Sequence, residues 1–175
     1  VASKPSIINH TNQTNNQIIN SLQIFDPQTL IDNSENLTIE QMKRGVVGYV
    51  ELAQYSFQNK IACVDYSRKK IKWRNNEGNI MTDISMISLG KMFFESIAKR
   101  NTELAMKKVF EILDKLDAKD GEYNNLERER FEEDMMHFVE MKCSVSRINK
   151  GEKNVPFFNE FSRDVCKKNL IKNLI

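Results

Sequence analysis

The sequence predicts an α+β protein that is mostly α-helical: an N-terminal helix, a three-stranded antiparallel meander and then about four helices. Two observations carry this prediction. Apolar residues recur at helical spacing along most of the chain, whereas residues 60–83 alone alternate with period two between turn signals. The totals agree, since 175 residues with 40% hydrophobic and 29% charged content are typical of one globular domain.

The first twenty residues differ from the rest in composition. They are rich in Asn, Gln, Ser and Thr and poor in apolar side chains, so they bury too little surface to offset the entropy of ordering the chain. We therefore expect residues 1–20 to be a polar linker or arm and residues 21–175 to be a single α+β domain. Because the chain begins with Val, we also expect it to be a fragment of a longer protein.

The first well-defined helix is expected to begin at Thr38, where Gln41 three residues later completes a capping box. Apolar residues continue it on one face: Ile39, Met42, Val46, Val50 and Ala53. Gly45 and Gly48 lie inside this pattern, and each costs about 1 kcal/mol relative to Ala in a helix interior. Either the glycines let another backbone pack closely, or they break the helix to form a binding loop.

The meander is predicted from three short β segments, at residues 61–65, 70–74 and 80–82, with an Asn- and Gly-rich turn at residues 75–78. Along the middle strand, cations and apolar side chains alternate: Lys70, Lys72 and Arg74 on one face, Ile71 and Trp73 on the other. We expect the apolar face to pack on helices, with Trp73 in the core, and the opposite face to present a ladder of cations.

From residue 83 onward the pattern is helical. One helix is expected to follow a cap at Thr82 or Asp83, a second to cover residues 101–117, and a long acidic one to cover residues 123–148. Pro156 suits the first position of a last helix, which carries Phe157, Phe158, Phe161, Val165, Leu170 and Leu174. This aromatic helix either closes the core or offers an apolar face to a partner.

Charge is unevenly distributed although the net charge is only +2. Residues 61–110 hold ten Lys or Arg against five Asp or Glu, residues 111–140 hold four against eleven, and residues 141–175 hold eight against three. The acidic block therefore lies between two basic ones. Either the blocks neutralise one another within the fold or an oligomer, or the basic surface meets nucleic acid or an acidic partner.

Three cysteines without a CxxC pair argue against a disulfide framework or a structural zinc site. We expect a reducing, intracellular compartment, with Cys63 as a small buried hydrophobe. No 18-residue apolar run and no signal peptide is present, so no membrane association is expected.

The candidate binding residues are the cations of the meander, which have aromatic residues between them: Arg68, Lys69, Lys70, Lys72 and Arg74. Cations at this density neutralise several phosphates, which predicts nucleic-acid binding without strong sequence readout. The alternative is that they protect a sheet edge from aggregation while Trp73 fills the core. The alternation itself favours the second interpretation for Trp73.

No residues are assigned to catalysis, to a metal or to a cofactor. Glu133 and His137 are four apart on one helix, as in carboxylate metal sites of bundles, but no second helix repeats the pattern, which favours a solvated acidic face. A nuclease motif is incomplete because the strand after Asp65 has no acid. There is no G-x-S-x-G, Walker A or G-x-G-x-x-G motif.

Three pieces of the sequence carry a resemblance: the Gly-containing helix at residues 37–51, Cys-Val-Asp-Tyr-Ser-Arg-Lys-Lys at residues 63–70, and Gly-Asn-Ile-Met-Thr-Asp at residues 78–83. Together they resemble a C-terminal domain of uncharacterised proteins of giant DNA viruses, over residues 20–100. In those proteins it tends to follow a zinc-finger-like segment and a coiled coil. The resemblance implies a viral protein, in the host cytoplasm or the virion, that acts on nucleic acid.

Taken together, these observations predict a non-enzymatic interaction module that binds nucleic acid through the basic meander and forms a homo-oligomer. The first alternative is a structural or oligomerisation domain that pairs its basic and acidic blocks. The second is an enzyme, nuclease-like, that the sequence does not reveal.

Overall fold

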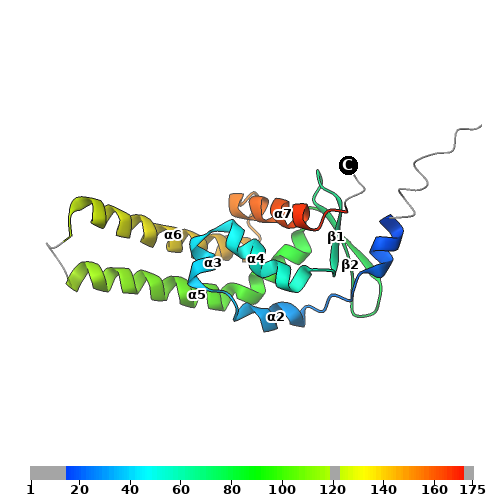
Figure 1. Cartoon of the computed structure of the whole chain (residues 1–175), viewed down its shortest axis with the longest axis horizontal. Helices are drawn as coiled ribbons and strands as arrows, with labels where there is room; N and C mark the ends of the chain where they lie inside the picture. The colour runs from blue at the N-terminus through cyan, green and yellow to red at the C-terminus, as the bar shows by residue number, and fades with distance from the viewer. Residues whose placement is uncertain (1–14, 119–122, 172–175) are drawn as a thin grey trace, which may run out of the picture.

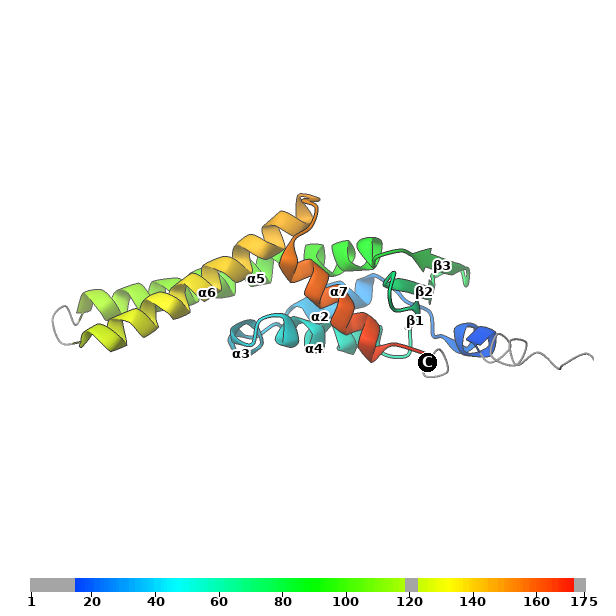
Figure 2. The same ribbon diagram turned by 90° about the horizontal axis from the view of Figure 1, so that it is seen from above.

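The computed structural model describes residues 15–118 and 123–171. Helices α2 (Gln28–Ser34), α3 (Ile39–Lys43) and α4 (Val46–Phe57) precede strands β1 (Ile61–Asp65), β2 (Lys70–Arg74) and β3 (Ile80–Asp83), and helices α5 (Ile87–Ala118), α6 (Asn125–Asn149) and α7 (Pro156–Lys168) follow them. The molecule is elongated, with the sheet at one end and the α5–α6 hairpin projecting from the other (Figures 1 and 2). The predicted α+β fold, mostly α-helical, is confirmed.

The sheet is the predicted antiparallel meander, in the order β1-β2-β3. Trp73 lies opposite Ile61 on one side and Met81 on the other, and its side chain is 7% exposed. The expectation that Trp73 anchors the core is therefore confirmed. The outer edge of β1 is closed by the segment after α7, because the Cys63 N–H donates to the Asn169 carbonyl at 2.8 Å.

The helix predicted to run on from Thr38 is two helices, and this part of the prediction is wrong. The capping box is present, with the Gln41 N–H donating to Thr38 Oγ1 at 3.2 Å. The chain then turns at Gly45, whose φ of +60° suits glycine, and α4 begins at the next residue. Close packing explains the other glycine, since a Cβ on Gly48 would lie 1.9 Å from the Gln41 carbonyl oxygen.

The boundary predicted near residue 101 is also wrong, because α5 is one unbroken helix. Asn101 lies in its middle, fully buried, and accepts a hydrogen bond from the Tyr49 hydroxyl. The hydroxyl of the next residue, Thr102, donates to the Ala98 carbonyl at 2.9 Å, so this polar group has its hydrogen-bond partner within the helix. Consequently α5, α6 and α7 follow the sheet, where the sequence predicts about four helices.

The last helix closes the core, as one of the two predicted alternatives requires. Pro156 occupies its first turn, and Phe157 and Phe161 are buried. Phe161 stacks on Phe93 with ring centroids 5.1 Å apart, and it meets Phe94 edge-on at 4.7 Å. Leu174, which the sequence assigns to the same apolar face, lies outside the described residues.

Residues 15–21 are helical and pack on the sheet. Ile19 and Leu22 are buried in a small cluster with Ala62 of β1 and Ile171 after α7. From residue 15 onward the predicted arm therefore contacts the domain, while residues 1–14 lie outside the described part. This contact covers one portion of the sheet face that carries the cations, because Ala62 lies opposite Lys72 in the strand register.

Candidate nucleic-acid interface

Two of the five predicted cations form the expected ladder. Lys70 and Lys72 occupy alternate positions of β2, on the face opposite the buried Ile71 and Trp73. Both side chains are half-buried, and neither has an ion-pair partner within residues 15–118 and 123–171. Among the described residues, no ion pair therefore neutralises their charges.

Arg74 has a different role from the one that the alternation predicts. Its Nη2 donates to the Asn20 carbonyl at 2.6 Å, and its own carbonyl accepts from the Phe25 N–H at 2.8 Å. The side-chain Nε is buried without a partner in the described structure. Arg74 thus fixes the N-terminal helical segment to the sheet.

Arg68 and Lys69 belong to the turn between β1 and β2. Asp65 Oδ1 accepts two hydrogen bonds, one from the Ser67 hydroxyl at 2.8 Å and one from the Arg68 N–H at 3.1 Å. These bonds lower the pKa of Asp65. The Arg68 guanidinium lies 3.5 Å from the same carboxylate but is 75% exposed, so the pair is a weak restraint. Lys69 has a φ of +49° and lines a hollow that Lys70 and Lys72 do not line.

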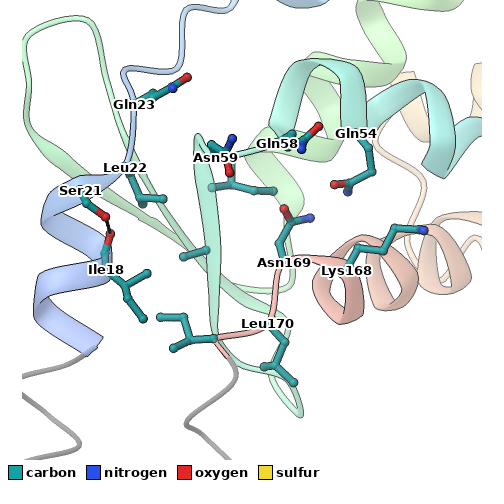
Figure 3. Close-up of a pocket in the computed structure, with 13 residues that line it drawn as sticks. Ile18, Ser21, Leu22, Gln23, Gln54, Gln58, Asn59, Lys168, Asn169 and Leu170 are labelled. Atoms are coloured by element: carbon teal, nitrogen blue, oxygen red, sulfur yellow. Dashed lines mark hydrogen bonds between the residues drawn. The ribbon is translucent and has the colours of Figure 1, made fainter.

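A depression of about 850 Å³ lies beside the ladder, at the start of β1 (Figure 3). Its carboxamide-bearing wall comes from the ends of α4 and α7 and from the segment after residue 21: Gln23, Gln54, Gln58, Asn59 and Asn169. Nε2 of Gln54 is buried and has no hydrogen-bond partner in the described part. Such groups donate and accept hydrogen bonds, and no local sequence signal marks them as one surface because they come from three segments.

Glu133 and His137 of the acidic helix differ in their surroundings. His137 Nε2 lies 2.9 Å from the Met42 carbonyl oxygen, so this nitrogen donates to the end of α3 at the helix break. Glu133 is exposed, as the solvated-face interpretation requires. Among the described residues, no three His, Cys, Asp or Glu side chains come close enough to hold a metal ion.

Two cysteines far apart in the sequence meet in the core. Cys63 of β1 and Cys166 of α7 are both fully buried, and their thiols share a hydrogen bond that, with burial, raises the pKa of Cys166. Burial of Cys63 agrees with the sequence prediction. The same hydrogen bond lowers the pKa of Cys63, but both thiols are fully buried, so neither is exposed to a reactant at the surface.

The basic and acidic segments lie far apart. Residues 60–74 hold six Lys or Arg against one Asp, and they form the sheet end. Residues 125–134 hold five acidic against two basic side chains, and they lie in the projecting end of the α5–α6 hairpin (Figures 1 and 2). The ladder is therefore not neutralised by this part of its own α6.

No family model matches the chain, and neither a curated protein nor a solved structure is similar enough to match it. In the described residues, no helix is both long enough and apolar enough to cross a membrane.

Proposed function

We propose that the protein is a non-catalytic interaction module whose sheet end binds nucleic acid through its phosphates. Lys70 and Lys72 are the central contacts, and the exposed Arg68 flanks them. The observation that supports this most directly is that two neighbouring lysines on one strand face have no ion pair in the described structure. Phosphate neutralisation releases counterions, and this release supplies most of the affinity of sequence-independent binding.

The composition of the surface favours phosphate contact over base reading by the ladder itself. Trp73 is in the core, so it is not available to stack on bases. Arg74 is held by the Asn20 carbonyl and does not offer the two-pronged contact that reads guanine. We therefore expect little preference for sequence and a strong dependence on salt.

The test is a salt titration of binding to fluorescent single-stranded and duplex DNA, followed by anisotropy. Wild-type affinity is expected to fall steeply as salt rises. In a Lys70→Glu/Lys72→Glu variant, two phosphate contacts are lost, so the salt dependence is expected to become weaker. The negative slope of log K against log salt decreases in magnitude by about 1.4 for single strands and about 1.8 for duplex.

The matched control reverses two exposed lysines of α5, Lys107→Glu/Lys115→Glu. It makes the same change in net charge at the opposite end of the molecule, so affinity and slope are expected to stay near wild type. Equal effects of the two variants would show that net charge alone drives binding. Binding that is unchanged in the Lys70→Glu/Lys72→Glu variant would contradict the proposal.

A second candidate function is oligomerisation through the two charged ends. The separation of the basic sheet end from the acidic hairpin favours head-to-tail contact between copies, in which unlike surfaces meet. The hairpin also exposes apolar side chains, among them Phe110, Leu126 and Met136. Light scattering across a salt series is expected to show a homo-oligomer that dissociates as salt rises; a monomer at every salt concentration would refute this.

We further propose that the protein is viral and acts in the host cytoplasm or the virion. The support is the resemblance carried by residues 37–51, 63–70 and 78–83 to domains of giant DNA virus proteins. Free cysteines at positions 63, 143 and 166 fit a reducing compartment.

A further inference from the structure

The molecule has a second concave surface, whose lining does not include Lys70 or Lys72. Three connections meet there: the β1–β2 turn, the β3–α5 connection and the α6–α7 connection. They enclose a hollow of about 450 Å³, which is within the range of small-molecule sites. Each connection contributes a charged or polar side chain, so the lining is assembled only by the tertiary fold.

The charge of this hollow is positive. Lys69, Lys91 and Lys153 line it, and Glu152 is the one acid of the lining. Glu152 accepts two hydrogen bonds from Arg147, at 2.8 and 2.6 Å, so its charge is already compensated. Lys91 lies 3.7 Å from Glu95 on the exposed surface of α5, whereas Lys69 and Lys153 have no ion pair within the described residues.

Three further polar side chains complete the lining without hydrogen bonds of their own in the described part: Ser85, Asn154 and Asn159. A hydroxyl and two carboxamides next to cations are suitable donors to phosphate oxygens. The lining also contains three apolar residues, Ile87, Ile148 and Phe158. Phe158 lies directly over Gly90, where a Cβ would come within 2.3 Å of its ring.

Backbone strain is concentrated at the same place. Among the described residues, five other than glycine have positive φ, and three of them line this hollow: Lys69 at 49°, Ser85 at 61° and Asn154 at 60°. Such conformations cost about 1–3 kcal/mol each and persist where the surrounding structure holds them. Each of the three connections thus places one residue with positive φ in the lining.

We propose that this hollow binds the phosphate monoester of a nucleotide, with Lys69 and Lys153 on the phosphate and Phe158 against the base. The cations select an anion, and the aromatic and aliphatic wall selects a flat apolar group attached to it. The ligand is either a free mononucleotide or the phosphorylated end of a strand. The site is independent of the ladder, because Lys70 and Lys72 are not part of its lining.

Calorimetric titration with adenosine 5′-monophosphate, adenosine and inorganic phosphate tests the chemistry. The monophosphate is expected to bind, inorganic phosphate to bind more weakly, and adenosine not to bind detectably. A Lys69→Gln/Lys153→Gln variant, shown to be folded by circular dichroism, is expected to weaken binding of the monophosphate at least tenfold. The matched control is Lys107→Gln/Lys115→Gln, which removes the same charge from exposed lysines of α5 outside the lining and is expected to bind the monophosphate like wild type.

A second arm distinguishes the two sources of the phosphate. Oligonucleotides with a 5′-phosphate and with a 5′-hydroxyl are compared at one salt concentration. Preference for the phosphorylated strand, lost in the Lys69→Gln/Lys153→Gln variant, supports strand-end binding even when the free monophosphate binds poorly. The proposal is overturned if neither the monophosphate nor the phosphorylated end is preferred over its phosphate-free counterpart, or if the Lys69→Gln/Lys153→Gln variant binds both like wild type.

Discussion

Replacing Gly48 with Ala tests the close approach of α3 and α4. A Cβ at this position would lie 1.9 Å from the Gln41 carbonyl oxygen and 2.5 Å from its carbonyl carbon. Both are backbone atoms, so no side-chain rotation relieves the contact. Because the shortest ordinary carbon–oxygen contacts are about 3.3 Å, the two helices have to separate by about 1.4 Å.

Two opposing effects determine how much Gly48→Ala changes the free energy of unfolding. Ala is favoured over Gly in a helix interior by about 1 kcal/mol. Overpacking of a core costs about 1–3 kcal/mol, and the upper value applies here because backbone faces backbone. The movement also carries Met42, which is fully buried on α3, away from its neighbours. We therefore expect the free energy of unfolding to fall by about 2 kcal/mol.

Urea unfolding measures this difference, with emission of the single Trp73 and far-UV circular dichroism as two probes. Val47→Ala is the matched control, since Val47 precedes Gly48 on the same helix and is 60% exposed. The control is expected to stay within about 0.5 kcal/mol of wild type. A Gly48→Ala protein as stable as wild type, or more stable, would refute the explanation of this glycine by close packing.

Two further predictions concern buried polar groups. Tyr49→Phe removes the donor to Asn101 Oδ1, which is fully buried, and is expected to cost about 1–3 kcal/mol of unfolding free energy in the same urea assay. Asp83 accepts a hydrogen bond from the Leu89 N–H at 2.9 Å, but burial raises the pKa of its carboxyl group. The carboxyl group therefore binds its titrating proton more tightly in the folded state than in the unfolded state. Its contribution to stability is therefore largest below about pH 3.9, the unfolded pKa, and falls as pH rises through the folded pKa. Asp83→Asn is expected to remove this dependence in a series of thermal melts across pH and to leave stability at neutral pH equal or higher; a lower stability and an unchanged pH profile would contradict it.

Local signals were sufficient for the elements that depend on neighbours in sequence. Alternation along residues 70–74 predicts that Ile71 and Trp73 face the core, and both do. Likewise, the Thr38 capping box and Pro156 at the start of α7 involve contacts within a few residues. Such features depend on backbone geometry and on residues close in sequence, so the local sequence is enough to predict them.

Tertiary contacts decided the elements that the sequence predicts incorrectly. Gly45 lowers the local helix propensity, but propensity alone does not say whether the helix breaks there or continues. The observed break, with a φ of +60° at Gly45, accompanies the packing of α3 against α4 and the contact of His137 with the end of α3. A polar residue near 101 resembles a boundary until Tyr49, 52 residues away, supplies its hydrogen bond. Helix propensity depends on residues close in sequence, so it does not reveal a hydrogen-bond partner 52 residues away.

The candidate site shows the same division. The density of cations between residues 68 and 74 is a property of the sequence, yet their uses depend on distant residues. Arg74 is bound by Asn20, 54 positions earlier, and Lys69 lies in a lining with Lys91 and Lys153. A run of cations in the sequence therefore predicts a charged surface, but it overestimates the number of those cations that lie on the same surface.

The two proposed functions of the sheet end are linked, because both partners would be polyanions that compete for the same lysines. Under the two proposals, Lys70 and Lys72 would be contacted either by a nucleic-acid phosphate or by the acidic start of α6 from another copy. In a head-to-tail assembly, each contact hides one ladder, so an oligomer exposes fewer ladders per chain than the monomer. If both proposals hold, nucleic acid would bind the free sheet end and shift the equilibrium toward smaller species by mass action, as any ligand favours the state that it binds. The hollow around Lys69 lies outside that competition, since its lining contains neither lysine of the ladder.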